Sequence, residues 1–243
     1  MDRIGYIGDS TVTFNKMNTY PQAGLSQGLL LYLKDDVFLR SFAVNGRSTK
    51  SFIDEGRLDV VEAWLEPGDF LFIQFGHNDE KQNDPSRYAA PFGAYQDNLR
   101  SMIGVARKKG ATPLLITPMA RRLFSPEGEF LGGSHGEYPS AMKQVAREEK
   151  VACIDLNMAS EAYLAVVGDY ASRPMFVYPK DNSHMTNLGA AVMAGFLADG
   201  LRRLGEPFSK LLVPKEGAVE EEPWKKEEKF SVVDLAFQSE KNE

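Results

Sequence analysis

Ser10, Asp181 and His184 are the residues whose types and order could together carry out acyl transfer. A serine hydroxyl attacks a carbonyl carbon when an imidazole takes up its proton, and a carboxylate on the second ring nitrogen fixes the tautomer of that imidazole. Ser10 lies in the turn Gly8-Asp9-Ser10-Thr11, and Asp181 precedes His184 by three residues. The sequence therefore predicts a Ser-His-Asp triad drawn from opposite ends of the chain.

Two further polar turns contain candidate donors for the oxyanion that forms during acyl transfer. Gly46 follows the apolar run 36–44, and Asn78 follows the run 69–75. A glycine backbone can approach a substrate closely because it has no Cβ, and a side-chain amide donates a hydrogen bond without carrying a charge. We expect the oxyanion to be held by the N–H groups of Ser10 and Gly46 and by the Asn78 amide.

Each of these positions also has a plainer interpretation when it is taken alone. Ser10 could belong to a turn or cap a helix, and Gly46 could be an ordinary turn glycine. Asn78 could cap a helix, and Asp181 with His184 could be a surface pair. The occurrence of all of them in one order, each after an apolar run, favours the chemical interpretation.

The sequence gives little support to a metal or cofactor site. His77 and His135 could join His184 as ligands, but no carboxylate or cysteine spacing supports such a set, so we favour supporting roles for both. Cys153 is the only cysteine and lies in an apolar run, which indicates a buried thiol and excludes an internal disulfide. We predict no metal and no cofactor.

Alternating strands and helices must position these residues. The apolar patterns predict strands at 3–8, 36–44, 69–75, 112–117 and 151–155, and helices at 20–33, 59–65, 88–109, 140–150, 158–168 and 187–204. Pro21 is expected in the first turn of the helix 20–33. The segment 82–87 is expected to be a polar loop, and 119–138 a long connection of the kind that is often functional. This alternation indicates an α/β fold with a five-stranded parallel sheet covered on both faces, and the carboxyl ends of its strands bring the polar turns to one edge.

Composition narrows the class of protein. The 243 residues carry a net charge of −6 and a hydrophobic content of 43%, which is typical of a globular protein with an ample core. No dense basic patch and no apolar stretch of transmembrane length occur, so we predict no nucleic-acid partner and no membrane partner. The first strand begins within three residues of the N-terminus, which leaves no room for a signal peptide, and we expect a cytoplasmic protein.

The composition changes after Val213, which divides the chain into a catalytic domain, 1–213, and a C-terminal tail, 214–243. The tail contains a mixed charge run followed by apolar residues such as Trp224 and Phe230. These residues are too apolar for a purely disordered segment. A tail that is docked on its own subunit, a tail that is partly disordered, and a homo-oligomer formed through the tail all remain open.

Four short blocks resemble those of the SGNH (GDSL-like) hydrolase superfamily, in the order found there. They are Gly8-Asp9-Ser10-Thr11, Asn45-Gly46-Arg47-Ser48, Gly76-His77-Asn78-Asp79 and Asp181-x-x-His184. Within the superfamily the chain is similar to the rhamnogalacturonan acetylesterases of carbohydrate esterase family 12, through these blocks and through 117–124 and 135–142. The resemblance implies a flavodoxin-like three-layer α/β/α sandwich with strand order 2-1-3-4-5.

The resemblance also implies an activity and a substrate. The expected function is a serine esterase that removes O-acetyl groups from pectic rhamnogalacturonan or its oligosaccharides through an acetyl-serine intermediate. Because many relatives are secreted and this chain shows no signal peptide, oligosaccharides are the more plausible substrate. Other carbohydrate O-acetylesterases such as xylan esterases, short-chain lipases or thioesterases, and a silent carbohydrate-binding protein are the alternatives.

Arg47, Arg121 and His135 are candidates for contact with that acetylated carbohydrate. The forked guanidinium of arginine suits the carboxylate of a galacturonate unit. Arginines in such loops also anchor the loop itself, and both roles stay open for Arg47 and Arg121. For Arg122 we favour the anchoring role.

Overall fold

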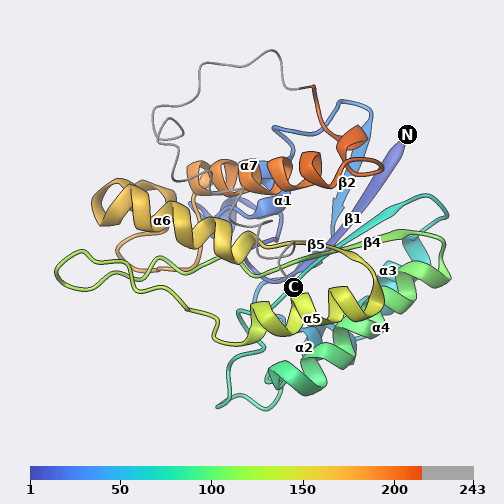
Figure 1. Ribbon diagram of the computed structural model, residues 1–243, viewed down its shortest axis with the longest axis horizontal. Coiled ribbons are helices and arrows are strands. Elements are labelled where there is room, and N and C mark those ends of the chain that lie inside the picture. The colour runs from blue at the N-terminus through green and yellow to red at the C-terminus, as the bar shows by residue number, and fades with distance from the viewer. Residues whose placement is uncertain (215–243) are drawn as a thin grey trace.

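The computed structural model describes residues 1–214. Its centre is a five-stranded parallel sheet in the order β2-β1-β3-β4-β5 (Figure 1), which confirms the expected topology. The strands are β1 (Asp2–Gly8), β2 (Val37–Ser41), β3 (Phe70–Gln74), β4 (Thr112–Ile116) and β5 (Ala152–Ile154).

Helices cover both faces of the sheet and complete the three layers (Figure 1). One face is covered by α1, α6 and α7, and the other by α2, α3, α4 and α5. The fold is therefore the α/β/α sandwich that the resemblance implied. The helices are α1 (Leu25–Leu29), α2 (Thr49–Asp54), α3 (Arg57–Trp64), α4 (Gln96–Lys108), α5 (Tyr138–Glu149), α6 (Leu156–Ser172) and α7 (Asn187–Leu204).

Each face of the sheet has its own hydrophobic core, because successive strand side chains point to opposite faces. On β1, Ile4 and Tyr6 belong to the core under α1, α6 and α7, whereas Ile7 belongs to the core under α2 to α5. All five residues of β3 are buried, as expected for a central strand. This burial fixes the register that brings the strand ends to one edge.

The prediction of a helix over 20–33 is wrong in its extent. The helix α1 begins only at Leu25, four residues after Pro21, so Pro21 is not in its first turn. Before α1 the chain makes a turn over residues 20–21 and then an isolated bridge, in which the Ala23 N–H donates to the Met185 carbonyl at 2.8 Å. α1 then crosses α7 at Gly28, where a Cβ would lie 2.1 Å from the Ala190 oxygen. Only glycine permits this approach.

Other boundaries shift for local reasons. The short helix α2 was not expected, although Ser48 caps it by accepting a hydrogen bond from the Ser51 N–H at 3.1 Å. The helix expected over 88–109 begins at Gln96, after an irregular turn over Pro91–Tyr95. α6 continues to Ser172 beyond the expected stop at Gly168, where its dihedral angles are non-helical.

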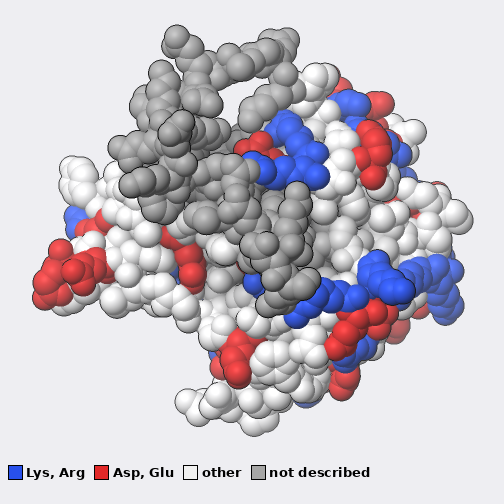
Figure 2. Space-filling model, viewed as in Figure 1, with Lys and Arg blue, Asp and Glu red and all other residues white. Residues whose placement is uncertain are grey.

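Charges of both signs lie next to one another on the face shown in Figure 2. On the surface of α3, α4 and α5, Arg107 pairs with Glu149 at 2.6 Å and Lys108 pairs with Glu62 at 2.5 Å. Among the described residues no helix is long and apolar enough to cross a bilayer. Apart from Pro214, the proposed tail 214–243 lies outside the described residues.

Candidate active site

Ser10 lies in a tight turn at the carboxyl end of β1. The Asp9 carbonyl accepts hydrogen bonds from the Val12 and Thr13 N–H groups, both at 3.1 Å. The Asp9 carboxylate accepts a further pair from the N–H and hydroxyl of Thr11, at 2.9 and 2.8 Å. These four bonds fix the backbone on both sides of Ser10, whose residue surface is only 7% exposed.

The structure brings Ser10, His184 and Asp181 into one hydrogen-bonded row. The Ser10 Oγ lies 2.8 Å from His184 Nε2, and His184 Nδ1 lies 2.5 Å from Asp181 Oδ2. A carboxylate at Nδ1 makes that nitrogen the donor, which leaves Nε2 as the acceptor for the serine hydroxyl. This is the arrangement that nucleophilic attack by a serine requires.

Asp181 is held as a charged, oriented carboxylate. Its Oδ1 accepts from the N–H groups of Ser183 and His184, at 2.7 and 2.9 Å. Partial burial raises the pKa of Asp181, but the hydrogen bonds from the His184 ring and from these two N–H groups outweigh it and bring the pKa below its usual range. The carboxylate therefore stays ionised well into the acid range.

Three candidate hydrogen-bond donors lie in the turns that follow the neighbouring strands β1, β2 and β3. Within residues 1–214 the N–H groups of Ser10 and Gly46 have no hydrogen-bond acceptor. Gly46 has a φ of +79°, a left-handed conformation that glycine adopts without strain. Asn78 is 4% exposed, and its Nδ2 donates to the Arg47 carbonyl at 3.0 Å, which leaves one N–H of the amide for a ligand. Such donors can hold an oxyanion.

A layer of buried titratable side chains, His77, His135, Asp9 and Asp79, packs beneath the surface of these turns. His77 packs edge-on against His135 with ring centroids 4.3 Å apart, and its Nδ1 lies 3.6 Å from Asp9 Oδ2. Burial lowers the pKa of His77 to about 4, so its ring is neutral at pH 7. Burial raises the pKa of Asp79 to about 8, even though its Oδ1 accepts from the N–H and hydroxyl of Thr49 at 2.9 and 2.5 Å.

His135 and Arg121 tie together the loops around the triad. His135 is 2% exposed; its Nδ1 lies 3.0 Å from Glu80 and its Nε2 2.7 Å from the Met119 carbonyl. Both ring nitrogens are thus occupied, and the ring supports the loops rather than offering a surface to a substrate. Arg121 pairs with Glu80 and donates to the Ser183 hydroxyl at 2.5 Å, so it joins the loop after β3 to the loop that carries His184. A substrate role for Arg121 stays a prediction.

Arg122 has the anchoring role that we favoured. Its side chain is buried and forms an ion pair with Asp169 and a hydrogen bond to the Ser172 hydroxyl at 3.0 Å. Its guanidinium lies between the rings of Phe124 and Tyr178, 5.0 and 4.8 Å from their centroids. The Arg122 N–H also donates to the carbonyl of Asn182, at 2.7 Å, within the His184 loop.

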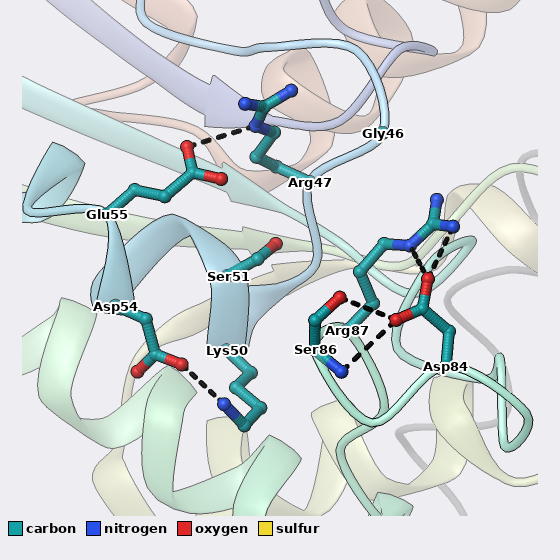
Figure 3. A pocket seen from close by; sticks show the side chains of 9 residues that line it. All are labelled: Gly46, Arg47, Lys50, Ser51, Asp54, Glu55, Asp84, Ser86 and Arg87. Atoms are coloured by element: carbon teal, nitrogen blue, oxygen red, sulfur yellow. Dashed lines mark hydrogen bonds and ion pairs between the residues drawn. The ribbon is translucent and has the colours of Figure 1, made fainter.

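A charged pocket of about 500 Å³ opens beside Gly46, between α2 and the loop 84–87 (Figure 3). Arg47 lines it, pairs with Glu55 at 3.1 Å and stays 32% exposed at its side chain, so contact with a substrate remains open for this residue. The other cations of the pocket are also paired, Lys50 with Asp54 and Arg87 with Asp84. The sequence reasoning missed Asp84 and Arg87, since the polar loop 82–87 has no periodicity to mark them.

Within residues 1–214 no group of three or more His, Cys, Asp or Glu side chains could hold a metal ion. The three histidines do not converge on one point: His184 bonds to Ser10 and Asp181, whereas His77 and His135 pack edge-on against each other in the buried layer. Cys153 is buried and makes no disulfide.

Comparison with known proteins decides the family. Residues 6–192 match the model of the GDSL-like Lipase/Acylhydrolase family. The chain belongs to this family. It is a carboxylic ester hydrolase, and its resemblance to the SGNH hydrolases and their rhamnogalacturonan acetylesterases is confirmed by its relatives.

Two similar relatives come from Bacillus subtilis. The probable rhamnogalacturonan acetylesterase YesY is 40% identical over 215 residues, which cover 87% of this chain and 98% of that protein. The rhamnogalacturonan acetylesterase RhgT is 36% identical over 222 residues, which cover 86% of this chain and 94% of that protein.

Solved structures show the same fold. The crystal structure of YxiM from Bacillus subtilis superposes with a TM-score of 0.75 and 29% identity, over 84% of this chain and 57% of that one. Axe2, an acetylxylan esterase from Geobacillus stearothermophilus, gives a TM-score of 0.58 at 17% identity, over 85% of this chain and 95% of that one. At that identity the likeness extends to the fold alone.

Proposed function

We propose that this family member is a serine esterase that removes O-acetyl groups from pectic rhamnogalacturonan or its oligosaccharides. The observation that carries the proposal is the row in which Ser10 Oγ lies 2.8 Å from His184 Nε2 and Asp181 lies 2.5 Å from His184 Nδ1. The substrate is supported by the names of two relatives, the probable rhamnogalacturonan acetylesterase YesY at 40% identity and the rhamnogalacturonan acetylesterase RhgT at 36%.

The proposed mechanism has two steps through an acetyl-serine. The Ser10 oxygen attacks the acetyl carbonyl carbon while its proton passes to His184 Nε2, and Asp181 stabilises the imidazolium that forms. The N–H groups of Ser10 and Gly46 and the Asn78 amide hold the oxyanion of the tetrahedral intermediate. The C–O bond to the sugar then breaks, and His184 returns the proton to the departing sugar oxygen. Water repeats the sequence on the acetyl-serine and releases acetate.

Acetate release from a panel of oligosaccharides tests both reaction and substrate. The panel comprises acetylated rhamnogalacturonan, acetylated xylan and chitin oligosaccharides. We expect fastest release from the first, and none from it when Ser10 is changed to alanine. Ser101→Ala on α4 is the matched control and should keep wild-type activity. Wild-type activity in Ser10→Ala would overturn the mechanism, whereas faster release from xylan would overturn only the substrate.

A second assay separates an acetylesterase from a lipase. We expect kcat/KM on p-nitrophenyl esters to fall by about 10-fold or more from acetyl to octanoyl. The pocket beside Gly46 is lined by charged side chains, and a long acyl chain gains about 0.8 kcal/mol per CH₂ only where it meets apolar surface. A rise of kcat/KM with chain length would favour the lipase alternative. Binding of the acetylated oligosaccharide with no acetate release would favour the silent binding protein.

A further inference from the structure

The amide of Asn78 must face one way to serve the proposed oxyanion site. An asparagine amide has two orientations related by a half turn, and only one presents its NH₂ group to a given ligand. Asn78 Nδ2 donates to the Arg47 carbonyl at 3.0 Å, and Asn78 Oδ1 accepts from Arg87 Nη1 at 3.4 Å. The turned amide would place oxygen against oxygen at Arg47 and donor against donor at Arg87. Both contacts therefore select the same orientation.

Arg87 is itself held in place by its own loop (Figure 3). Its Nε and Nη2 both reach Asp84 Oδ2, at 2.6 and 2.5 Å. The other oxygen of Asp84 accepts from the N–H and hydroxyl of Ser86, at 3.1 and 2.5 Å. This use of two guanidinium nitrogens by Asp84 leaves Nη1 directed to Asn78.

The same guanidinium lies beside the second oxyanion turn. A Cβ placed on Gly46 would have Arg87 Nη1 as its nearest neighbour, at 3.9 Å. Arg87 thus lies next to the turn of Gly46 and the turn of Asn78, the two turns besides that of Ser10 that supply oxyanion donors.

We infer that Arg87 is a positioning residue, which fixes the orientation of the Asn78 amide for catalysis, and that Asp84 holds Arg87 for this task. The inference rests on the proposed function, because it needs Asn78 as an oxyanion donor. The competing interpretation is an ion pair that merely closes the loop. A pair whose two side chains are 31% and 30% exposed contributes little to stability, so such a role would leave kcat unchanged. A mutant cycle distinguishes the two.

The cycle uses Arg87→Met, Asn78→Ala and the double variant, with p-nitrophenyl acetate as the probe. This ester carries no sugar, so a loss of sugar contacts at Arg87 would not register. We expect Arg87→Met to lower kcat by about 10-fold, the effect of one lost hydrogen bond to a charged group, with KM changed less than about twofold. Asn78→Ala should lower kcat by about 100- to 1000-fold. In the double variant the Arg87 change should have no further effect.

Arg100→Met is the matched control. The Arg100 side chain is 33% exposed against 31% for Arg87, and it also pairs with carboxylates, those of Asp97 and Glu148. Arg100→Met should keep wild-type kcat. The change in its melting temperature shows how much stability the loss of a surface ion pair costs, for comparison with Arg87→Met. If Arg87→Met does not fold, Asp84→Asn replaces it in the cycle. In the wild-type background we then expect a fall in kcat smaller than that given for Arg87→Met. In the Asn78→Ala background we expect no further fall.

Two results would overturn the inference alone, and a third would overturn it together with the oxyanion assignment. One is an unchanged kcat in Arg87→Met together with a strongly lowered kcat in Asn78→Ala. This result would leave the proposed function intact. The other is an equal fall in kcat on both backgrounds, which would show that Arg87 acts independently of Asn78. An unchanged kcat in Asn78→Ala would remove the oxyanion assignment itself, and the inference with it.

Discussion

Single residues set the protonation states on which the proposed chemistry depends. Asp181→Asn should lower kcat by about 10⁴-fold, the loss seen when the equivalent carboxylate of serine proteases becomes an amide and the imidazole takes the wrong tautomer. The amide oxygen of the new side chain could still accept the Ser183 and His184 N–H groups, so the loop should stay folded. Steady-state kinetics and a thermal melt check this, with Asp97→Asn on α4 as control. A loss below about tenfold would argue against a triad.

Asp79 gives a prediction about stability and pH. Its pKa of about 8 in the folded protein lies above the value of about 4 for an unfolded aspartate, so the folded state binds the extra proton between these values. The free energy of unfolding attributable to Asp79 therefore falls as pH rises from about 4 to about 8. Asp79→Asn, which is neutral at every pH, should be less sensitive to this rise. Urea unfolding at about pH 5 and about pH 8 measures the free energy of unfolding of both proteins. An equal change in this free energy between the two pH values in the wild type and in Asp79→Asn would contradict the prediction.

At the scale of elements, the crossing of α1 and α7 links the two ends of the chain. Gly28→Ala should lower the free energy of unfolding by about 1–3 kcal/mol, because its Cβ would meet the Ala190 backbone. Gly104→Ala in α4 is the control: its Cβ would meet nothing within 4 Å, so it should stabilise by about 0.5–1 kcal/mol. Denaturant unfolding measures both. Equal effects would mean that α1 and α7 can move apart freely.

Helices were predictable where their own pattern was long and capped. The expected range 187–204 matches α7, whose Thr186 cap accepts from the Gly189 N–H. The range 20–33 failed at its start because Ala23 is held in a bridge to Met185, a partner that no local pattern reveals. α2 was missed because its six residues are too few to show a period.

At the scale of the whole molecule, net charge bears on the choice between polymer and oligosaccharide. A charge of −6 repels a polyanionic pectic chain at long range, and salt screens this repulsion. We expect kcat/KM on polymeric acetylated rhamnogalacturonan to rise about 2- to 5-fold when salt is raised from about 10 to about 150 mM. The value for neutral p-nitrophenyl acetate should not change. A fall in kcat/KM on the polymer as salt is raised would contradict this, and would indicate that basic side chains attract the polymer to the site.

The sheet explains how much of the site could be predicted. Parallel strands end at one edge, so Ser10, Gly46 and Asn78 could be placed together from the sequence, and His184 joined them by its chemistry. Arg87 could not be placed, because its contact with Asn78 arises only when a loop without periodicity folds back on the turn that follows β3. Buried His135 was expected at the rim for the same reason: nothing local marks a side chain that a distant Glu80 covers.

The bond between Ser10 and His184 spans 174 residues of sequence. A ribosome must have released the chain at least as far as His184 before those two groups can touch. On the proposed mechanism, a nascent polypeptide can therefore hydrolyse esters only after the loop that carries His184 has docked against the turn that carries Ser10. Recovery of esterase turnover after dilution from denaturant would time the docking of the His184 loop. Circular dichroism would separately time the formation of the sheet, whose last strand ends at Ile154.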